Sequence, residues 1–336
     1  MGKNNTDPLL SIQDLNTWFF SRKGTAKAVN GVSFDLAAGQ VLGVVGESGC
    51  GKSVTAQSVM QLVPDPPGKI VSGKILYRGK DLVPMTREQM RHIRGNKISM
   101  IFQEPMTSLN PVYTIGDQIS EMFTLHKGCN KRQAMAAAAD MLQKVQIPAP
   151  HKRVHDYPHQ LSGGMRQRAM IAMALSCDPE ILIADEPTTA LDVTVQAQIL
   201  DLMLALKEEY NTAIQMITHD LGVIAEMADQ VVVMYAGRVV EAAPTKNLFS
   251  SPLHPYTKGL MASIPVLGER TKGQAKGLTE IPGMIPSLYD LPKGCRFVNR
   301  CPHAFDRCKT QEPELSRADA GHDVRCWLHS QGEVTP

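Results

Sequence analysis

A glycine-rich turn between a buried strand and a helix constrains this chain more than any other feature. The apolar run Val41–Val45 predicts a buried strand, and the octapeptide Gly46-Glu-Ser-Gly-Cys-Gly-Lys-Ser53 follows it directly. The octapeptide fits GxxxxGK[ST], and a helical pattern begins at Lys52, which is the context of a true phosphate loop. Glycines let consecutive backbone N–H groups turn inward around a phosphate, and the helix presents its positive end there. We therefore predict a nucleotide-phosphate site, with the Lys52 ammonium on the β- and γ-oxygens and the Ser53 hydroxyl on Mg²⁺.

A second strand end carries two acidic side chains. The run Ile181–Ala184 predicts another buried strand, and Asp185 and Glu186 follow it. A carboxylate at the end of a neighbouring strand reaches the magnesium shell, and an adjacent one faces the attacking water as general base. We assign the first role to Asp185 and the second to Glu186. The simpler interpretation is a solvated strand end.

A third motif opens a helix. The segment Leu161–Arg168 reads LSGGMRQR and places Ser162, Gly163 and Gly164 at the start of an apolar-periodic helix that runs to about Ser176. Such an N-terminus binds anions. Because one phosphate loop already holds the phosphates, a second phosphate-binding surface suggests that it serves another subunit's nucleotide. A simple N-cap would explain the serine but not the paired glycines.

Strand and helix patterns alternate over most of the chain. Further strands are predicted at Ala213–Thr218 and Gln230–Tyr235, and apolar residues at helical spacing from Val195 to Leu206 predict an amphipathic helix. We therefore predict an α/β fold, with a parallel sheet covered by helices. Residues 113–176 are almost wholly helical in composition and predict an inserted subdomain. Residues 266–294 are rich in Gly, Pro and Lys and predict a linker or irregular extension.

Composition excludes several classes of protein. The 35 basic and 33 acidic residues give a net charge of +2, so bulk charge does not point to nucleic acid or to an anionic bilayer. No segment approaches the roughly 18–20 consecutive apolar residues that a membrane-spanning helix needs. The N-terminus also lacks the apolar core of a signal peptide. We expect a cytosolic protein that does not bind nucleic acid.

The cysteines are unevenly distributed. Of seven, four crowd into the tail: Cys295, Cys301, Cys308 and Cys326. An odd number of cysteines in a cytosolic protein argues against a disulfide framework. Because the tail has little apolar periodicity, we expect a metal centre, and not a hydrophobic core, to hold it in a defined structure. Zinc ribbons use tight CxxC pairs, and none occurs here, so the spacing favours an iron–sulfur cluster held by four thiolates. Zinc, with His303 or His322 as a further ligand, and unliganded thiols are the alternatives.

Together these motifs resemble the ATP-binding subunits of ABC transporters, over about residues 8–265. Residues 46–53 correspond to the Walker A loop, residues 161–168 to the signature, and residues 181–186 to Walker B with its glutamate. The resemblance implies a P-loop ATPase domain with a mixed sheet and an inserted helical subdomain. It also implies a head-to-tail pair of such domains, in which each ATP lies between one partner's Walker A loop and the other's signature.

The resemblance assigns roles to further residues. Gln103, in Phe102-Gln-Glu-Pro105, is identified with the Q-loop glutamine that touches Mg²⁺ and water and senses the transmembrane partner. His219 is identified with the switch histidine on the γ-phosphate, and Ala190-Leu-Asp192 with the D-loop. The implied catalytic residues are therefore Glu186, His219 and Gln103, and the implied magnesium ligands are Ser53, Gln103 and Asp185.

Members of this family stack an aromatic ring on adenine. Trp18, Phe19 and Phe20 lie at the corresponding place, and strand alternation turns Phe19 opposite to its two neighbours. We favour Phe19. The whole implied nucleotide set is Phe19, Gly46, Ser48, Gly49, Gly51, Lys52, Ser53, Val54, Gln103, Ser162, Gly163, Gly164 and Asp185.

Three segments narrow the resemblance to the dipeptide/oligopeptide importer branch of bacterial ABC ATPases. They are Met100–Pro111, the helix start at His254–Lys258 and the cysteine-rich tail. The branch implies an extracytoplasmic peptide-binding protein, two different transmembrane permease subunits and a paralogous ATPase that pairs with this chain as a heterodimer. It also implies a peripheral position on the cytoplasmic face of the bacterial inner membrane. Some members carry a [4Fe–4S] cluster in the tail, here residues 295–330, which adds to the case for a cluster.

Two other readings of the function stay open. Nickel, glutathione and antimicrobial-peptide systems share the branch, so each is an alternative cargo. A non-transport ABC ATPase of DNA repair or translation is a different class. Repair proteins carry a long coiled coil and translation proteins usually fuse two cassettes, and this chain has neither. Intact Glu186 and His219 disfavour an inactive cassette.

Overall fold

The structure, a computed structural model, is divided into two compact units whose segments alternate along the sequence. The first contains Leu36–Val41 and Pro84–Ile217, and the second contains Leu10–Asp35, Leu42–Val83 and the chain from Thr218 onward. The residues that the structure describes are 7–103, 108–189, 191–263, 280–319 and 321–329.

The first unit has a parallel sheet in the order β6-β7-β8. Strand β6 spans Ile98–Ile101, β7 spans Ile181–Asp185 and β8 spans Ala213–Thr218. Ile181 of β7 lies opposite Ile98 of β6 on one side and opposite Ala213 of β8 on the other. All three strands are buried along their whole length, as expected for parallel strands that are covered on both faces.

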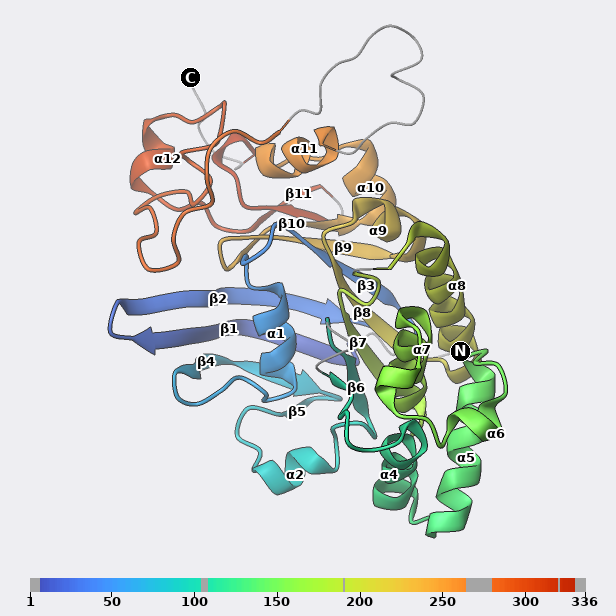
Figure 1. The fold of residues 1–336 in the computed structure, drawn as a ribbon. Coiled ribbons are helices and arrows are strands. Elements are labelled where there is room, and N and C mark those ends of the chain that lie inside the picture. The colour runs from blue at the N-terminus through green and yellow to red at the C-terminus, as the bar shows by residue number, and fades with distance from the viewer. Residues whose placement is uncertain (1–6, 104–107, 190, 264–279, 320, 330–336) are drawn as a thin grey trace, which may run out of the picture. The chain divides into compact units, whose positions relative to one another are not determined.

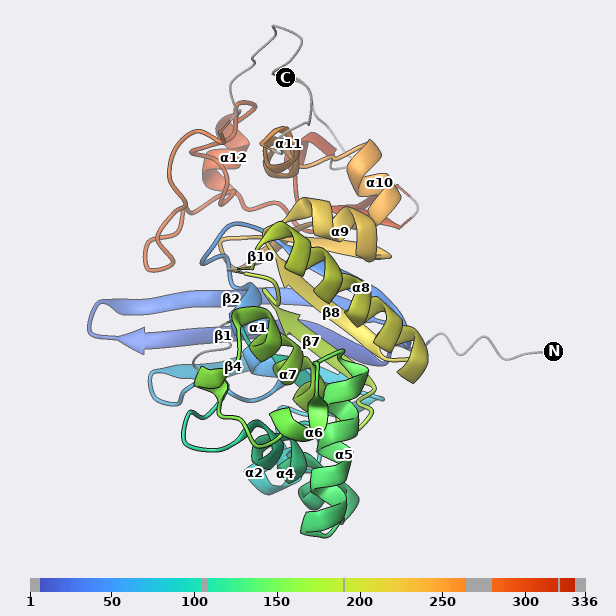
Figure 2. The ribbon, with the colours of Figure 1, turned by 45° about the vertical axis from the view of Figure 1, so that its right-hand side comes forward.

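The helical subdomain predicted between residues 113 and 176 is present in this unit. Its helices α4, α5 and α7 lie side by side in both views (Figure 1 and Figure 2). Helix α4 is capped by the Thr114 side chain and α5 by a capping box of Asn130 with Gln133, which explains where each begins. The helices of the unit are α2 (Arg87–Arg91), α4 (Ile115–Lys127), α5 (Lys131–Lys144), α6 (Pro150–Arg153), the 3₁₀ helix η1 (Pro158–Gln160), α7 (Gly163–Leu175) and α8 (Val193–Tyr210).

The amphipathic helix predicted between Val195 and Leu206 is α8. Its buried face is Ile199, Leu200, Leu202, Met203 and Leu206, whereas Val195 is half-buried. The 3.6-residue period therefore placed this face correctly.

The second unit contains two groups of strands. One is a four-stranded sheet in the order β2-β1-β4-β5, whose long strands are drawn in blue in Figure 2. The other runs β11-β12-β10-β9-β3, with β3 parallel to β9 and the remaining pairs antiparallel. This arrangement is the predicted mixed sheet. The strands are β1 (Leu10–Ser21), β2 (Gly24–Leu36), β3 (Val41–Val45), β4 (Gly68–Tyr77), β5 (Lys80–Asp81), β9 (Gln230–Tyr235), β10 (Arg238–Pro244), β11 (Ser316–Asp319) and β12 (His322–Val324).

The C-terminal tail is part of this second unit. Its strand β12 pairs with β10, with Val324 opposite Glu241 and Asp323 opposite Ala242. Residues 280–294 contain no helix or strand, and residues 264–279 lie outside the described part. The boundaries predicted for the three segments, 8–265, 266–294 and 295–330, stay predictions.

Two helices of the second unit begin where the sequence predicts. Helix α1 starts at Lys52, and α11 follows its cap His254. Across the described ranges, no helix has both the length and the apolar character needed to cross a bilayer. The helices of this unit are α1 (Lys52–Val59), α9 (Leu221–Met227), α10 (Thr245–Ser250), α11 (Pro255–Ala262), α12 (Asp306–Thr310) and the 3₁₀ helix η3 (Trp327–His329).

The capping histidine of α11 is buried without a charge. His254 is 2% exposed, and its Nδ1 accepts a hydrogen bond from the Tyr256 backbone N–H at 3.0 Å. Burial, and then the charge of His329, lowers the pKa of His254 to about 3. An unfolded histidine titrates near pH 6.5, so the unfolded chain takes up this proton first as the pH falls. Stability is therefore complete above about pH 6.5 and decreases by roughly 4–5 kcal/mol as the pH falls toward 3.

Replacing His254 with asparagine should remove this pH dependence. Asparagine keeps a side-chain acceptor at the cap but does not titrate, so the urea midpoint of His254→Asn should change less between about pH 7 and 4 than that of the wild type. His151→Asn is the control, because His151 is exposed. Equal slopes in His254→Asn and the wild type would contradict the assignment.

Candidate active site

The phosphate loop takes a backbone path that requires glycine. Gly46 has φ 149° and Gly51 has φ 105°, both in the region that L side chains rarely adopt. A Cβ atom on Gly46 would lie 2.2 Å from the carbonyl oxygen of Met234, and one on Gly51 would lie 2.3 Å from that of Ala28. The loop is therefore pressed against β9 and β2, and no larger residue fits at either glycine.

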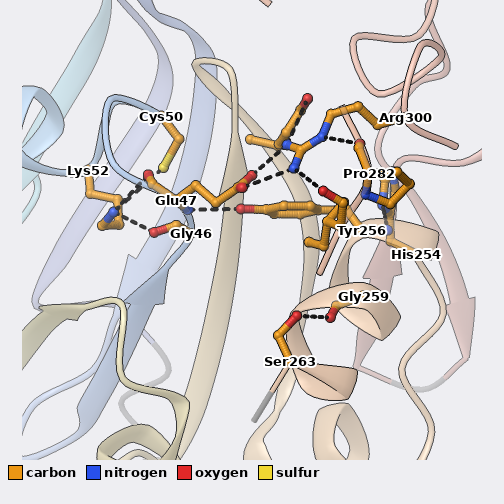
Figure 3. A network of polar contacts seen from close by, with 12 residues as sticks. Gly46, Glu47, Cys50, Lys52, His254, Tyr256, Gly259, Ser263, Pro282 and Arg300 are labelled. Carbon is orange, nitrogen blue, oxygen red and sulfur yellow. Dashed lines mark hydrogen bonds and ion pairs between the residues drawn. The ribbon is translucent and has the colours of Figure 1, made fainter. Parts of the chain in front are cut away.

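Lys52 places its ammonium group inside the loop. Its side chain is buried, and Nζ donates to the carbonyl oxygens of Gly46 at 2.6 Å and Glu47 at 3.1 Å (Figure 3). Burial raises the pKa of the neighbouring Cys50 thiol, and this effect outweighs the charge of Lys52. Ser53 follows on the same helix. A cation within a turn of backbone N–H groups at a helix N-terminus fits a bound phosphate.

Glu186 has a strained backbone at the end of β7. Its φ is 48°, a left-handed value that costs a non-glycine residue about 1–3 kcal/mol and that clusters at active sites. The Glu186 N–H donates to the carbonyl oxygen of Ile217 at 2.8 Å, which helps to hold this conformation. The preceding Asp185 is 4% exposed.

Two side chains orient the Glu186 carboxylate. Gln103 Nε2 donates to Oε2 at 3.1 Å, and Thr189 Oγ1 donates to the same oxygen at 2.9 Å. The structure thus brings the predicted Q-loop glutamine to the predicted general base. The contact of Thr189 with Glu186 was not predicted. The position of Thr189 three residues after Glu186, in a turn, could have indicated it. Together the two donors fix the direction in which this carboxylate points.

The signature motif forms the first turn of helix α7, which is capped by Ser162 and exposed at Gly163. Ser162 Oγ accepts a hydrogen bond from the Met165 N–H at 3.3 Å, so the N-cap interpretation of the serine is confirmed. A Cβ on Gly164 would lie 3.0 Å from Val195 of α8, whereas one on Gly163 would meet no atom within 4 Å. Packing against α8 therefore explains Gly164. Gly163 is exposed, so its backbone is accessible to a ligand.

The switch and D-loop residues lie beside helix caps. His219 is exposed and follows β8, and the next residue, Asp220, caps α9 by accepting from the Gly222 N–H at 2.8 Å. Asp192 caps α8 in the same way, accepting from the Val195 N–H at 3.0 Å. Ala190, the first residue of the predicted D-loop, lies outside the described residues. The roles of His219 and the D-loop stay predictions.

The aromatic residues of β1 differ in their surroundings. Phe19 is half-buried, lies opposite Gly68 of β4 and packs over it. The Lys27 ammonium lies 5.0 Å from the centre of the Trp18 ring, and Phe20 is 47% exposed. Nothing in these contacts selects the ring that stacks on adenine, and Phe19 stays a prediction.

The predicted site residues are divided between the two units. Those of the first unit are Gln103, Ser162, Gly163, Gly164, Asp185 and Glu186, and those of the second are Phe19, Gly46, Ser48, Gly49, Gly51, Lys52, Ser53, Val54 and His219.

The four tail cysteines are free thiols, of which Cys308 is buried and Cys295, Cys301 and Cys326 are half-buried. Burial raises the pKa of Cys295 to about 12 and that of Cys326 to about 11, and repulsion from the other tail thiolates adds to both shifts. Within the described ranges, no three His, Cys, Asp or Glu side chains form a group that would hold a metal ion. The predicted iron–sulfur or zinc centre is thus not supported.

The two histidines considered as zinc ligands lie in different surroundings. His322 Nε2 hydrogen-bonds Oε1 of Glu241 at 2.7 Å, and both side chains are buried. Glu241 also accepts from the backbone N–H groups of Leu253 and His254. His303 is exposed. His322 therefore links the tail to β10 and α11 through Glu241.

Comparison with known proteins gives a family for these motifs. Residues 29–189 match the family described as ABC transporter, and residues 240–308 match the one described as oligopeptide/dipeptide transporter, C-terminal region. The chain is 52% identical over 323 residues to the oligopeptide transport ATP-binding protein AppD of Bacillus subtilis (strain 168), covering 96% of this chain and 97% of that protein. It is 50% identical over 325 residues to the dipeptide transport ATP-binding protein DppD of the same organism, covering 97% and 96%.

Solved structures share the fold. One is cbiO1 from Clostridium perfringens, part of the ABC transporter complex cbiONQ, with a TM-score of 0.62, 26% identity and coverage of 73% of this chain and 92% of that chain. Another is the dimeric bacterial ABC transporter cassette MJ0796, with a TM-score of 0.63, 24% identity and coverage of 70% and 98%. This chain belongs to the ABC transporter family as an ATP-binding, ATP-hydrolysing subunit that carries the C-terminal region of the oligopeptide/dipeptide transporters.

Proposed function

We propose that this chain hydrolyses ATP to drive the uptake of dipeptides or oligopeptides into a bacterial cell. Peptides are proposed as the cargo because residues 240–308 match the C-terminal region of oligopeptide/dipeptide transporters. Relatives named for oligopeptide and dipeptide transport align with the chain almost from end to end, which supports the same class. The nucleotide motifs carry no such information, because ABC ATPases of many cargoes share them.

In this proposal the phosphate loop and two further residues, Gln103 and Asp185, bind the nucleotide and its Mg²⁺. The Lys52 ammonium and the inward N–H groups of the loop bind the β- and γ-phosphates. Ser53, Gln103 and Asp185 would hold Mg²⁺, which neutralises phosphate charge when bound. The oxygen-rich donor set of hydroxyl, amide and carboxylate suits this hard cation.

Hydrolysis then depends on the carboxylate of Glu186. It accepts a proton from the water that attacks the γ-phosphorus in line with the leaving oxygen. The hydrogen bonds from Gln103 and Thr189 support this role because they aim the carboxylate. Lys52 and His219 stabilise the charge that develops on the γ-phosphoryl oxygens.

The exposed N-terminus of helix α7 and membership in the ABC transporter family support the proposed partners. The accessible backbone of Gly163 supports binding of a nucleotide held by a second ATPase, and we propose that this partner is a paralogous subunit in a heterodimer. Two transmembrane permease subunits complete the motor. An extracytoplasmic peptide-binding protein delivers cargo, and this chain lies peripherally on the cytoplasmic face of the inner membrane.

Co-purification tests the proposed assembly. A tagged full-length chain, isolated from detergent-solubilised bacterial membranes, should bring down two membrane subunits and one second ATPase in near-equal amounts. Its ATPase activity should rise when the peptide-loaded binding protein is added. An untagged strain is the control. Recovery of ribosomal or DNA-repair proteins in place of membrane subunits would contradict transport.

The iron–sulfur cluster at Cys295, Cys301, Cys308 and Cys326 stays a prediction that the described residues do not support. Iron and acid-labile sulfide, measured on protein purified without oxygen, test it. Stoichiometric zinc with neither iron nor sulfide would reject the cluster.

A further inference from the structure

The phosphate loop is bound from the C-terminal part of the chain through Glu47. The Glu47 backbone N–H donates to the Tyr256 hydroxyl at 2.8 Å. Its carboxylate forms a two-pronged ion pair with Arg300, with N–O distances of 2.7 and 3.0 Å (Figure 3). Glu47 directly follows Gly46, so these contacts act on the first turn of the loop.

Arg300 is fully engaged by this arrangement. A guanidinium carries five N–H donors, and here each has an acceptor. Two go to the carboxylate of Glu47, one to the Tyr235 hydroxyl, and one each to the carbonyl oxygens of Ile281 and Pro282. The hydrogen bonds to Glu47 are the main cause that raises the pKa of Arg300. The side chain is therefore held in one orientation.

Aromatic rings pack around the Arg300 guanidinium. The Arg300 guanidinium lies 5.8 Å from the centre of the Tyr235 ring and 5.9 Å from that of Phe297. Tyr235 and Phe297 pack against each other and against Tyr256, and all three are buried. The Arg300 side chain is itself 4% exposed. A buried cation costs free energy unless a carboxylate compensates it, and Glu47 is the carboxylate that compensates Arg300.

The loop itself needs a compensating charge. A carboxylate in a phosphate loop repels the phosphates unless a cation neutralises it and turns it aside. Arg300 does both, while Lys52 donates to the Glu47 carbonyl oxygen at 3.1 Å from within the loop. Glu47 is thus bound at its N–H, its carbonyl and its side chain. Because these contacts already hold the loop in one conformation, the loop loses less conformational entropy when it binds a ligand.

We propose that Arg300 is a positioning residue for ATP binding, through which the C-terminal region braces the phosphate loop and neutralises Glu47. Arg300 hydrogen-bonds the Glu47 carboxylate, so it acts on the nucleotide through the loop. The inference rests on the proposed binding of ATP at this loop. ATP binding by the wild-type chain is therefore measured alongside, so that a loop that does not bind ATP is distinguished from a loop that binds ATP without the help of Arg300.

The test is a double-mutant cycle on the full-length chain, with a fluorescent ATP analogue and Mg²⁺. Arg300→Gln should raise the Kd about tenfold, because the Glu47 charge is then left facing the phosphates. Glu47→Gln should change the Kd by no more than about threefold. The Glu47→Gln, Arg300→Gln pair should bind more tightly than Arg300→Gln alone. In the assembled transporter, Arg300→Gln should raise the KM for ATP and leave kcat within about twofold.

A matched control separates positioning from general stability. Glu312→Gln breaks the ion pairs of Glu312 with Arg238 and Arg296 in the same region without touching the loop, so its Kd should equal that of the wild type. If Arg300→Gln does not fold, Arg300→Lys and the double variant carry the test, and Arg300→Lys should fall between the wild type and the double variant. An unchanged Kd in a folded Arg300→Gln, or an equal loss in Glu312→Gln, would overturn the proposal. So would a double variant no better than Arg300→Gln.

Discussion

Replacing Glu186 with glutamine is expected to slow ATP hydrolysis by about 10²–10⁴-fold, the usual contribution of a general base, and to leave ATP binding intact. The amide oxygen of glutamine still accepts the hydrogen bonds that Gln103 and Thr189 donate to the carboxylate, so the local geometry is kept. The amide does not accept the proton of the attacking water. Turnover at saturating ATP in the assembled transporter, measured beside the ATP Kd, checks both halves of this expectation.

Glu209→Gln is the control for this substitution. Glu209 belongs to the same unit, pairs with Lys144 at the surface and lies in none of the nucleotide motifs. Its removal should leave turnover unchanged, since exposed ion pairs contribute little. Near-normal turnover of Glu186→Gln would show that another group is the base.

Replacing Lys52 with alanine is expected to weaken nucleotide binding about a hundredfold. The buried ammonium is the cation that lies inside the loop, and charged hydrogen bonds contribute up to roughly 3 kcal/mol, which corresponds to this factor. The loss should therefore appear in the Kd for ATP and not only in turnover, unlike that of Glu186→Gln. Titration of the full-length chain with a fluorescent ATP analogue measures it.

Two further variants make the Lys52 result specific. Lys52→Met keeps the length of the side chain without its charge and should bind as weakly as the alanine variant. Lys69→Ala removes an exposed lysine of the same unit and should leave the Kd unchanged. Wild-type affinity in both Lys52 variants would remove this residue from the phosphate site.

The parts of the fold that sequence predicted well are those specified by adjacent residues. Strands β3, β8 and β9 begin and end at the predicted residues, because their mostly apolar sequences suit buried parallel strands. Helix α7 begins directly after Ser162 because that side chain caps it. The phosphate loop is also specified by adjacent residues, because the path of its backbone requires glycine at fixed positions in one short segment.

The contacts that sequence did not predict join distant residues. Glu47 and Arg300 are separated by 253 positions, and neither lies in a pattern that marks a partner. The pairing of β12 with β10 was missed for the same reason, because a three-residue strand is too short to show alternation. The metal centre in the cysteine tail stays a prediction. Its spacing suggests such a centre, but close spacing along the chain does not set the geometry of ligands, and the described residues show no group of three that would hold a metal ion.

Peptide uptake by cells that lack this chain tests the central claim most directly. Such cells, supplied with wild-type protein or with Glu186→Gln at equal expression, are given a radiolabelled tripeptide, and its accumulation is followed over time. The account predicts uptake with the wild-type chain and almost none with Glu186→Gln, because hydrolysis by this subunit powers transport. Equal uptake with both proteins, or no dependence of uptake on the chain, would contradict it.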